Sequence, residues 1–177
     1  MAVVALMLLD IRNLCVRFRQ QGREIHAVQA LELRLARNEI LAVVGESGAG
    51  KSQAFLSITR LLPENAIITG QAWLNGHDLL ALDEDGLQSV RGRKIAYVFQ
   101  DPMTALNPHL KIRTQLVEVV NRHQGLDGAA AVEKARAMLE LVRLSEANVL
   151  LAQYPHHLSG GQRQRVMLAM ALLGKPE

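Results

Sequence analysis

One stretch of the chain, residues 45–52, has the residue types and the spacing to bind phosphate. It reads Gly-Glu-Ser-Gly-Ala-Gly-Lys-Ser and fits the pattern G-x-x-x-x-G-K-[ST]. Its glycines would let backbone N–H groups approach phosphate oxygens without a Cβ in the way. Lys51 would bring a positive charge to the phosphates, and the Ser52 hydroxyl would supply one ligand to Mg²⁺. The candidate residues are Gly45, Glu46, Ser47, Gly48, Ala49, Gly50, Lys51, Ser52 and the adjacent Gln53.

The segments on either side favour a strand–loop–helix unit over a chance glycine turn. Residues 39–44 form an almost continuous apolar run that is typical of a buried strand. Residues 53–58 open a helix, which we expect to continue to about Leu62 and to stop at Pro63. A strand, a glycine loop and a helix N-terminus together make an anion site. The bare pattern alone should arise by accident in roughly one chain in a hundred of this size.

The first half of the chain is predicted to be rich in strands. Residues 8–44 alternate apolar and polar side chains in two segments, with a tight turn at 36–39 in which Asn38 suits a left-handed conformation. Residues 71–76 should form a strand that closes on an Asn-Gly turn. Residues 95–99 predict a second buried strand, which ends at Gln100.

The second half is predicted to be helical from residue 112 to residue 173, and it carries a second motif. Residues 158–162 read Leu-Ser-Gly-Gly-Gln, a run expected by chance in roughly one chain in several thousand. Ser159 is a good helix N-cap, and the glycines after it would expose N–H groups at the start of a helix. The sequence therefore predicts a second anion site, more than a hundred residues after the first.

Two phosphate-binding elements this far apart, joined through a Gln-tipped strand and a helical insert, resemble the nucleotide-binding domain of ABC (ATP-binding cassette) transporters. The resemblance covers essentially the whole chain. It implies an α/β fold: a P-loop NTPase core of ABC type with an N-terminal antiparallel β subdomain and an α-helical subdomain, incomplete at the C-terminus. Residues 8–177 would be a partial domain, with the β subdomain and P-loop core at about 8–100 and the helical subdomain at about 101–173.

The resemblance also implies roles for single residues. Residues 45–52 resemble the Walker A loop, which holds ATP and Mg²⁺, and Gln100 resembles the Q-loop glutamine, which contacts Mg²⁺ and couples the site to the membrane subunits. Ser52 and Gln100 would thus be the metal contacts. Phe18 stands where the family has an aromatic that stacks on adenine, with a strand-core phenylalanine as the alternative. The signature motif, which contacts ATP held by the opposite subunit, would comprise Ser159, Gly160, Gly161 and Gln162, after Leu158.

Residues 45–48, 99–108 and 154–159 resemble most the peptide/nickel importer ATPases of prokaryotes. The resemblance implies uptake of di- or oligopeptides or a related solute, driven by ATP. The expected partners are a second ATPase subunit, transmembrane permease subunits and, indirectly, a solute-binding protein. The expected location is peripheral, on the cytoplasmic side of the cell membrane. A soluble, non-transport ABC ATPase and a non-catalytic nucleotide-binding module are the alternatives.

In the family, a segment like residues 172–177 leads into an aliphatic strand that ends in Asp-Glu, the Walker B carboxylate and the catalytic glutamate, and a later histidine follows. This sequence ends at Glu177, before these residues. We therefore expect a fragment that binds nucleotide, does not hydrolyse ATP by itself, and exposes an apolar face where further strands would pack.

Composition excludes several other classes. The net charge is only +3 and aromatic residues make up 3%, so we expect no nucleic-acid partner. Cys15 is the single cysteine, which rules out an internal disulfide and suits a reducing compartment. The apolar opening run, residues 2–9, is too short to span a bilayer and is better interpreted as a leader into the first strand. Adjacent His156 and His157 are poorly placed to share a metal ion.

Overall fold

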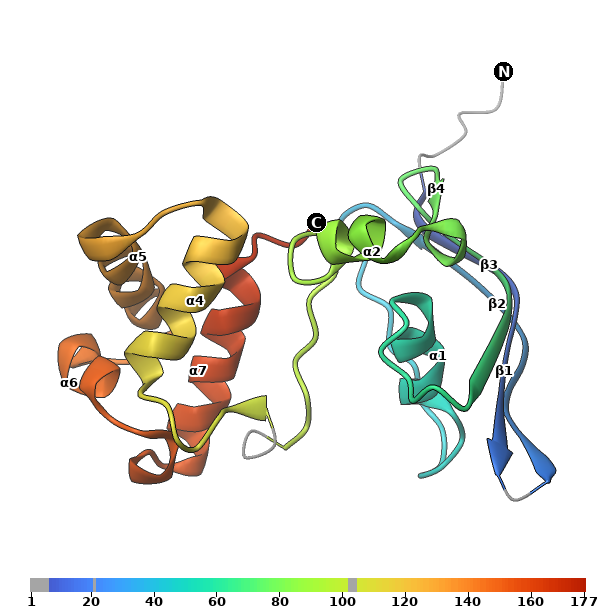
Figure 1. Cartoon of the computed structure of the whole chain (residues 1–177), viewed down its shortest axis with the longest axis horizontal. Helices are drawn as coiled ribbons and strands as arrows, with labels where there is room; N and C mark the ends of the chain where they lie inside the picture. The colour runs from blue at the N-terminus through green and yellow to red at the C-terminus, as the bar shows by residue number, and fades with distance from the viewer. Residues whose placement is uncertain (1–6, 21, 102–104) are drawn as a thin grey trace. The chain divides into compact units, whose positions relative to one another are not determined.

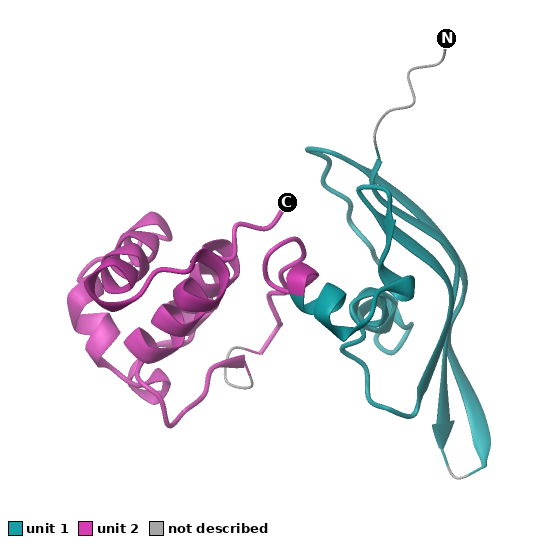
Figure 2. Ribbon diagram, turned by 45° about the horizontal axis from the view of Figure 1, so that its top comes forward, with its two compact units in different colours: residues 1–88 teal, residues 89–177 magenta. Residues whose placement is uncertain are grey.

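The computed structural model describes residues 7–20, 22–101 and 105–177. The chain forms two compact units, residues 1–88 and residues 89–177, which are described separately (Figures 1 and 2). The start of the apolar opening run, residues 2–6, and residues 102–104 of the importer-like segment lie outside the described residues. Within the described ranges, no helix is both long and apolar enough to cross a membrane.

The first unit is built on a four-stranded antiparallel sheet in the order β2-β1-β3-β4 (Figure 1). β1 (Met7–Gln20) and β2 (Arg23–Ala36) form a long hairpin, and β3 (Ala66–Leu74) pairs with the other edge of β1. β4 (His77–Asp78) follows β3 after a turn in which Asn75 has φ 48° and Gly76 has φ 82°. Positive φ at both central residues is the geometry of a type I′ turn, so the predicted Asn-Gly turn is confirmed.

A β-bulge in β1 brings the apolar side chains of this strand to one face. Ile11, Leu14 and Val16 are all fully buried, although Ile11 and Leu14 are three residues apart and would point to opposite faces of a regular strand. Asn13 takes up the extra residue with a left-handed φ of 47°. Gly70 of β3 lies against this bulge, where an added Cβ would be 2.4 Å from the Asn13 carbonyl oxygen.

The helix that follows the glycine loop, α1 (Lys51–Ile58), packs on the sheet through contacts with β1 and β2. It ends at Ile58, earlier than the predicted end near Leu62. Arg60 has a left-handed φ of 50° and donates to the Ser57 carbonyl, while Leu61 donates to the Leu56 carbonyl at 2.9 Å. This is a Schellman motif, which satisfies the last carbonyls of the helix before Pro63 is reached.

Two short helices, η1 (Leu79–Ala81) and α2 (Glu84–Val90), lead to the second unit, which is helical. It contains α4 (Ile112–Gln124), α5 (Gly128–Leu141), α6 (Ala147–Ala152), η2 (Pro155–His157) and α7 (Gly160–Leu173), which confirms the helical reading of residues 112–173. The buried core of this unit is formed by Leu106, Ile112, Leu116, Val120, Ala131, Ala135, Leu139, Leu144, Ala147, Leu150, Leu151, Leu158, Val166, Ala169 and Leu173.

The two predicted buried strands, residues 39–44 and 95–99, are wrong. Both segments are irregular apart from an isolated bridge between Arg91 and Ile95. The apolar side chains of 40–44 are exposed, with Ile40 98% and Val44 89% accessible, whereas those of 95–97 are half-buried and only Val98 and Phe99 are exposed. A strand needs a neighbour for its hydrogen bonds and a cover for its side chains. No strand of the described sheet β2-β1-β3-β4 pairs with either segment. The expected exposure of apolar side chains is found in each of the two segments.

Candidate functional site

The glycine loop, residues 45–52, is shaped by two glycines with left-handed backbones. Gly48 has φ 84° and Gly50 has φ 82°, a conformation that costs a residue with a Cβ about 1–2 kcal/mol. Gly50 is also the N-cap of α1, and a Cβ there would lie 2.1 Å from the carbonyl oxygen of Ala27 in β2. At Gly48 an added Cβ would meet nothing within 4 Å. Gly50 thus allows the loop to lie close against β2, whereas Gly48 affects only the backbone direction of the loop.

Lys51 folds back over the loop. Its Nζ donates to the carbonyl oxygen of Gly45 at 2.7 Å and to that of Glu46 at 2.6 Å. Gly50 has no side chain to cap α1, so among the described residues no side chain accepts from the N–H groups of its first turn. The positive charge of the half-buried Lys51 and the uncapped N–H groups together favour an anion at the loop.

The two residues after Lys51 differ in environment. Ser52 is exposed. Gln53 is half-buried, and its Oε1 is a buried acceptor that has no donor within the described part of the chain. A hollow of about 290 Å³ beside the loop is lined mostly by apolar groups of β2, α1 and residues 43–44, so its chemistry suits packing more than phosphate.

The second motif begins α7 as predicted. Ser159 is the N-cap: its Oγ accepts from the Gln162 N–H at 3.2 Å, and its own N–H donates to Gln162 Oε1 at 2.8 Å, which completes a capping box. Gly160 and Gly161 are exposed, have no left-handed φ, and leave nothing within 4 Å of an added Cβ. The described fold therefore does not require glycine at either position.

The structure places the remaining predicted residues in different settings. Phe18 is half-buried in β1, opposite Ile25 of β2 and Ala66 of β3. Gln100 is exposed on a bend after the irregular residues 95–99. Gln100 and residues 158–162 belong to the second unit, and Phe18 and residues 45–53 belong to the first.

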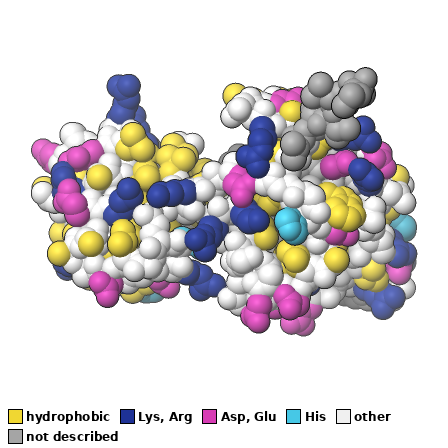
Figure 3. Space-filling model, turned by 90° about the horizontal axis from the view of Figure 1, so that it is seen from above, with side chains coloured by type: hydrophobic (Ala, Val, Ile, Leu, Met, Phe, Trp, Pro, Cys, Tyr) yellow, Lys and Arg dark blue, Asp and Glu magenta, His cyan; other side chains and the backbone are white. Residues whose placement is uncertain are grey.

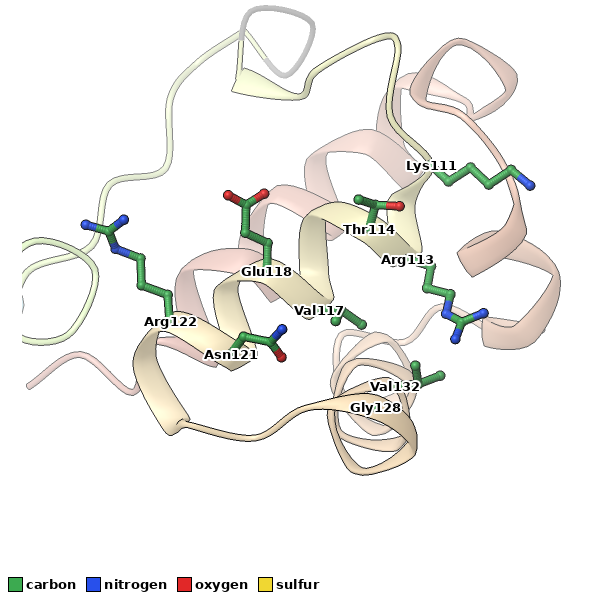
Figure 4. A pocket seen from close by; sticks show the side chains of 9 residues that line it. All are labelled: Lys111, Arg113, Thr114, Val117, Glu118, Asn121, Arg122, Gly128 and Val132. Carbon is green, nitrogen blue, oxygen red and sulfur yellow. The ribbon is translucent and has the colours of Figure 1, made fainter.

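Sequence reasoning did not single out a groove on the outer face of α4. It is a hollow of about 890 Å³ lined by residues of α4, α5 and the adjacent Lys111. Figure 4 shows Lys111 and Arg113 at the start of α4, Arg122 at its end, and Val117 on the side of Val132 of α5. Glu118 is the one carboxylate among the lining residues. On the face drawn in Figure 3, Lys and Arg side chains lie on both units among acidic and hydrophobic ones. Polar residues recur three or four positions apart along residues 111–122, and this helical spacing could have indicated the groove from the sequence.

The second unit contains a partly buried histidine, His123, and an exposed histidine pair, His156 and His157. Burial, and then the charges of Arg122 and Arg93, hold the pKa of His123 below its ordinary value. His156 and His157 are exposed and pack their rings against each other and against Tyr154. The described residues contain no group of three His, Cys, Asp or Glu side chains placed to hold a metal ion.

Known proteins give the context of these two motifs. A family model described as ABC transporter matches residues 28–177. The oligopeptide transport ATP-binding protein OppD of Salmonella typhimurium is 44% identical over 170 residues, which are 96% of this chain and 51% of OppD. OppD of Bacillus subtilis is 40% identical over 172 residues, 96% of this chain and 48% of that protein. The chain thus spans about half the length of the curated relatives it matches.

Solved structures agree. The ATP-binding cassette MJ0796, seen as a dimer in a post-hydrolysis state bound to ADP and Pi, aligns with a TM-score of 0.81 and 27% identity over 95% of this chain and 70% of that one. Clostridium perfringens cbiO1, part of the ABC transporter complex cbiONQ, shares the fold, with a TM-score of 0.72 and 23% identity over 96% and 62% of the two chains. These matches confirm the predicted ABC-type fold. The chain belongs to the ABC transporter family, whose ATPase domain binds nucleotide.

Proposed function

We propose that this chain is the ATP-binding part of the ATPase subunit of an importer for di- or oligopeptides or a related solute such as nickel. The observation that carries the proposal is the glycine loop, in which the Lys51 ammonium lies over the loop carbonyls and the start of α1 has no side-chain cap. The curated relatives named as oligopeptide transport ATP-binding proteins support the choice of solute. The subunit would lie on the cytoplasmic side of the membrane.

The proposed ligand is ATP with Mg²⁺. The two carbonyl contacts of Lys51 are neutral acceptors, which a phosphate can replace with a stronger, charge-assisted hydrogen bond. Lys51 would then hold the β and γ phosphates, and Ser52 and Gln100 would contact Mg²⁺. Phe18 would stack on the adenine, for which its half-buried ring leaves one part accessible.

The proposed site is completed by a second ATPase subunit. Ser159, Gly160 and Gly161 present a hydroxyl and helix-start N–H groups to the outside, in a place where the fold needs no glycine. This suits a phosphate that arrives from another subunit, so each ATP would lie between Lys51 of one copy and Ser159 of the other.

Permease subunits would contact the groove on α4. The cationic side chains of Lys111 and Arg113 at the start of α4 favour an acidic cytoplasmic segment of the permease. Charge reversal by Arg113→Glu should weaken co-purification with the permease, and Lys134→Glu on α5 is the matched control. Equal recovery of the permease with both variants would contradict this placement.

A mixing experiment tests the shared site. Lys51→Ala and Ser159→Ala are each introduced into a separate copy, and ATP-dependent association is measured by analytical ultracentrifugation. Neither variant alone has an intact composite site, but a mixed pair regains one, because the intact Lys51 and the intact Ser159 face each other. We expect the 1:1 mixture to associate more strongly with ATP and Mg²⁺ than either variant alone. If the mixture associates no better than the two single variants, Lys51 and Ser159 do not serve one shared site.

A further inference from the structure

Arg163, a residue with no role in the site described above, holds the turn that precedes Ser159. Its Nη1 donates to the carbonyl oxygen of Leu158 at 2.7 Å and lies 3.4 Å from that of Pro155. These carbonyls belong to η2 and its C-cap, where backbone oxygens carry partial negative charge and favour a cation. Arg163 is one helical turn after Ser159 and donates its backbone N–H to the Ser159 carbonyl at 3.0 Å.

The Leu158–Ser159 peptide group is thereby held at both of its polar atoms. Its carbonyl oxygen accepts from Arg163, and its N–H donates to Gln162 Oε1 at 2.8 Å. Because a peptide group is planar, fixing both atoms fixes the rotation of the whole group. The backbone direction at Ser159, and hence the direction of its Oγ, follows from that rotation.

The other end of the same segment is tied to α4. The Ile112 N–H donates to the Gln153 carbonyl at 2.9 Å, and the Lys111 ammonium lies 5.9 Å from the ring centre of Tyr154. Residues 153–158 therefore run between two anchors, one at the start of α4 and one on α7. The Arg163 anchor is the one next to the signature serine.

The stability of the fold alone does not explain why an arginine is present at position 163. Its Nε is a buried donor with no acceptor among the described residues, and a buried unpaired donor disfavours folding. A shorter or apolar side chain would avoid this cost. What such a side chain would lose is the hold on the Leu158 carbonyl.

We propose that Arg163 is a positioning residue: it sets the orientation of the Leu158–Ser159 peptide and so aims the Ser159 hydroxyl at the phosphate held by the opposite subunit. The inference rests on the proposed shared site. Arg163 itself touches neither nucleotide nor metal.

The test compares Arg163→Ala, Arg163→Lys and the control Gln164→Ala, an exposed neighbour on the same helix. For Arg163→Ala we expect unchanged ATP binding at the Lys51 loop, because that loop is in the other unit, and ATP-dependent association weakened by about tenfold or more. Arg163→Lys keeps a charged donor and should restore part of the association. Gln164→Ala should behave as wild type. Wild-type association in Arg163→Ala would overturn the proposal.

Amide hydrogen exchange separates this inference from the shared site itself. If the chain does not associate with ATP at all, the shared site fails, but the orientation claim still makes a prediction. The Ser159 and Gln162 amides should exchange faster in Arg163→Ala than in Gln164→Ala, with an intermediate rate in Arg163→Lys. Equal exchange rates in the three variants would show that Arg163 does not hold this turn.

Discussion

Gly48 and Gly50 offer a matched test of how the glycine loop is built. Both lie in the same loop with nearly the same left-handed φ, 84° and 82°, but only Gly50 lies against β2. We consider Gly48→Ala and Gly50→Ala. Because the backbone strain is shared, the difference between the two variants isolates the contact with Ala27.

The magnitudes follow from the geometry. A left-handed alanine costs about 1–2 kcal/mol, and the reduced freedom of the unfolded chain returns about 0.4–1 kcal/mol. Gly48→Ala should therefore destabilise by no more than about 1.5 kcal/mol. In Gly50→Ala the new Cβ would be 2.1 Å from the Ala27 oxygen, so the loop must also move away from β2. Overpacking of this kind adds about 1–3 kcal/mol.

Urea denaturation provides the assay. Trp73, the only tryptophan, lies in β3 of the same unit, so its fluorescence reports the unfolding of the sheet on which the loop packs. The midpoint should fall further for Gly50→Ala than for Gly48→Ala at an unchanged denaturant slope. ATP binding should also be weaker in Gly50→Ala, since the displaced loop no longer presents Lys51. Equal midpoints for the two variants, or a larger loss for Gly48→Ala, would refute the reasoning.

Three further outcomes are expected. The pKa of His123 is held below its ordinary 6.5, so the unfolded chain binds the proton of this histidine more readily than the folded chain does. The contribution of neutral His123 to stability is therefore complete above about pH 6.5 and is lost as the pH falls below that value. The melting temperature should therefore fall between pH 7.5 and 5, and it should fall less in His123→Gln. An equal fall in melting temperature in the wild type and in His123→Gln would contradict this prediction. Gly160→Ala and Gly161→Ala should leave stability unchanged or raise it by up to about 1 kcal/mol, while ATP-dependent association weakens; a lowered melting temperature would count against open space at these positions. Arg136 pairs with Glu133 and Glu140 on the surface of α5, and Arg136→Ala should cost at most about 1 kcal/mol in urea denaturation, less in high salt; a larger, salt-independent loss would be unexpected.

Features with a local cause could be predicted from the sequence. The turn at 36–39 is present, with Asn38 at φ 60° and a hydrogen bond from the Glu39 N–H to the Ala36 carbonyl. Ser159 caps α7 through neighbours only three residues away. Each of these depends on side chains and backbone atoms within one turn, so a short window of sequence contains the whole cause.

Features that depend on distant partners could not be predicted. Residues 39–44 have the composition of a buried strand, but whether they form one depends on segments that are distant in the sequence. The bulge at Asn13 shows itself only when β1 is aligned with its neighbours β2 and β3. In the candidate site, the glycines and Lys51 followed from the motif, but the hold of Arg163 on the Leu158 carbonyl required coordinates.

Direct binding of ATP tests the central claim, that residues 45–52 hold a nucleotide through Lys51. Isothermal titration calorimetry with ATP and Mg²⁺ should show one site per chain, a loss of affinity of at least about tenfold in Lys51→Ala, and no change in Lys134→Ala on α5. AMP, which lacks the β and γ phosphates, should not compete. Absence of ATP binding to the wild-type chain, or equal affinity in Lys51→Ala, would contradict the account.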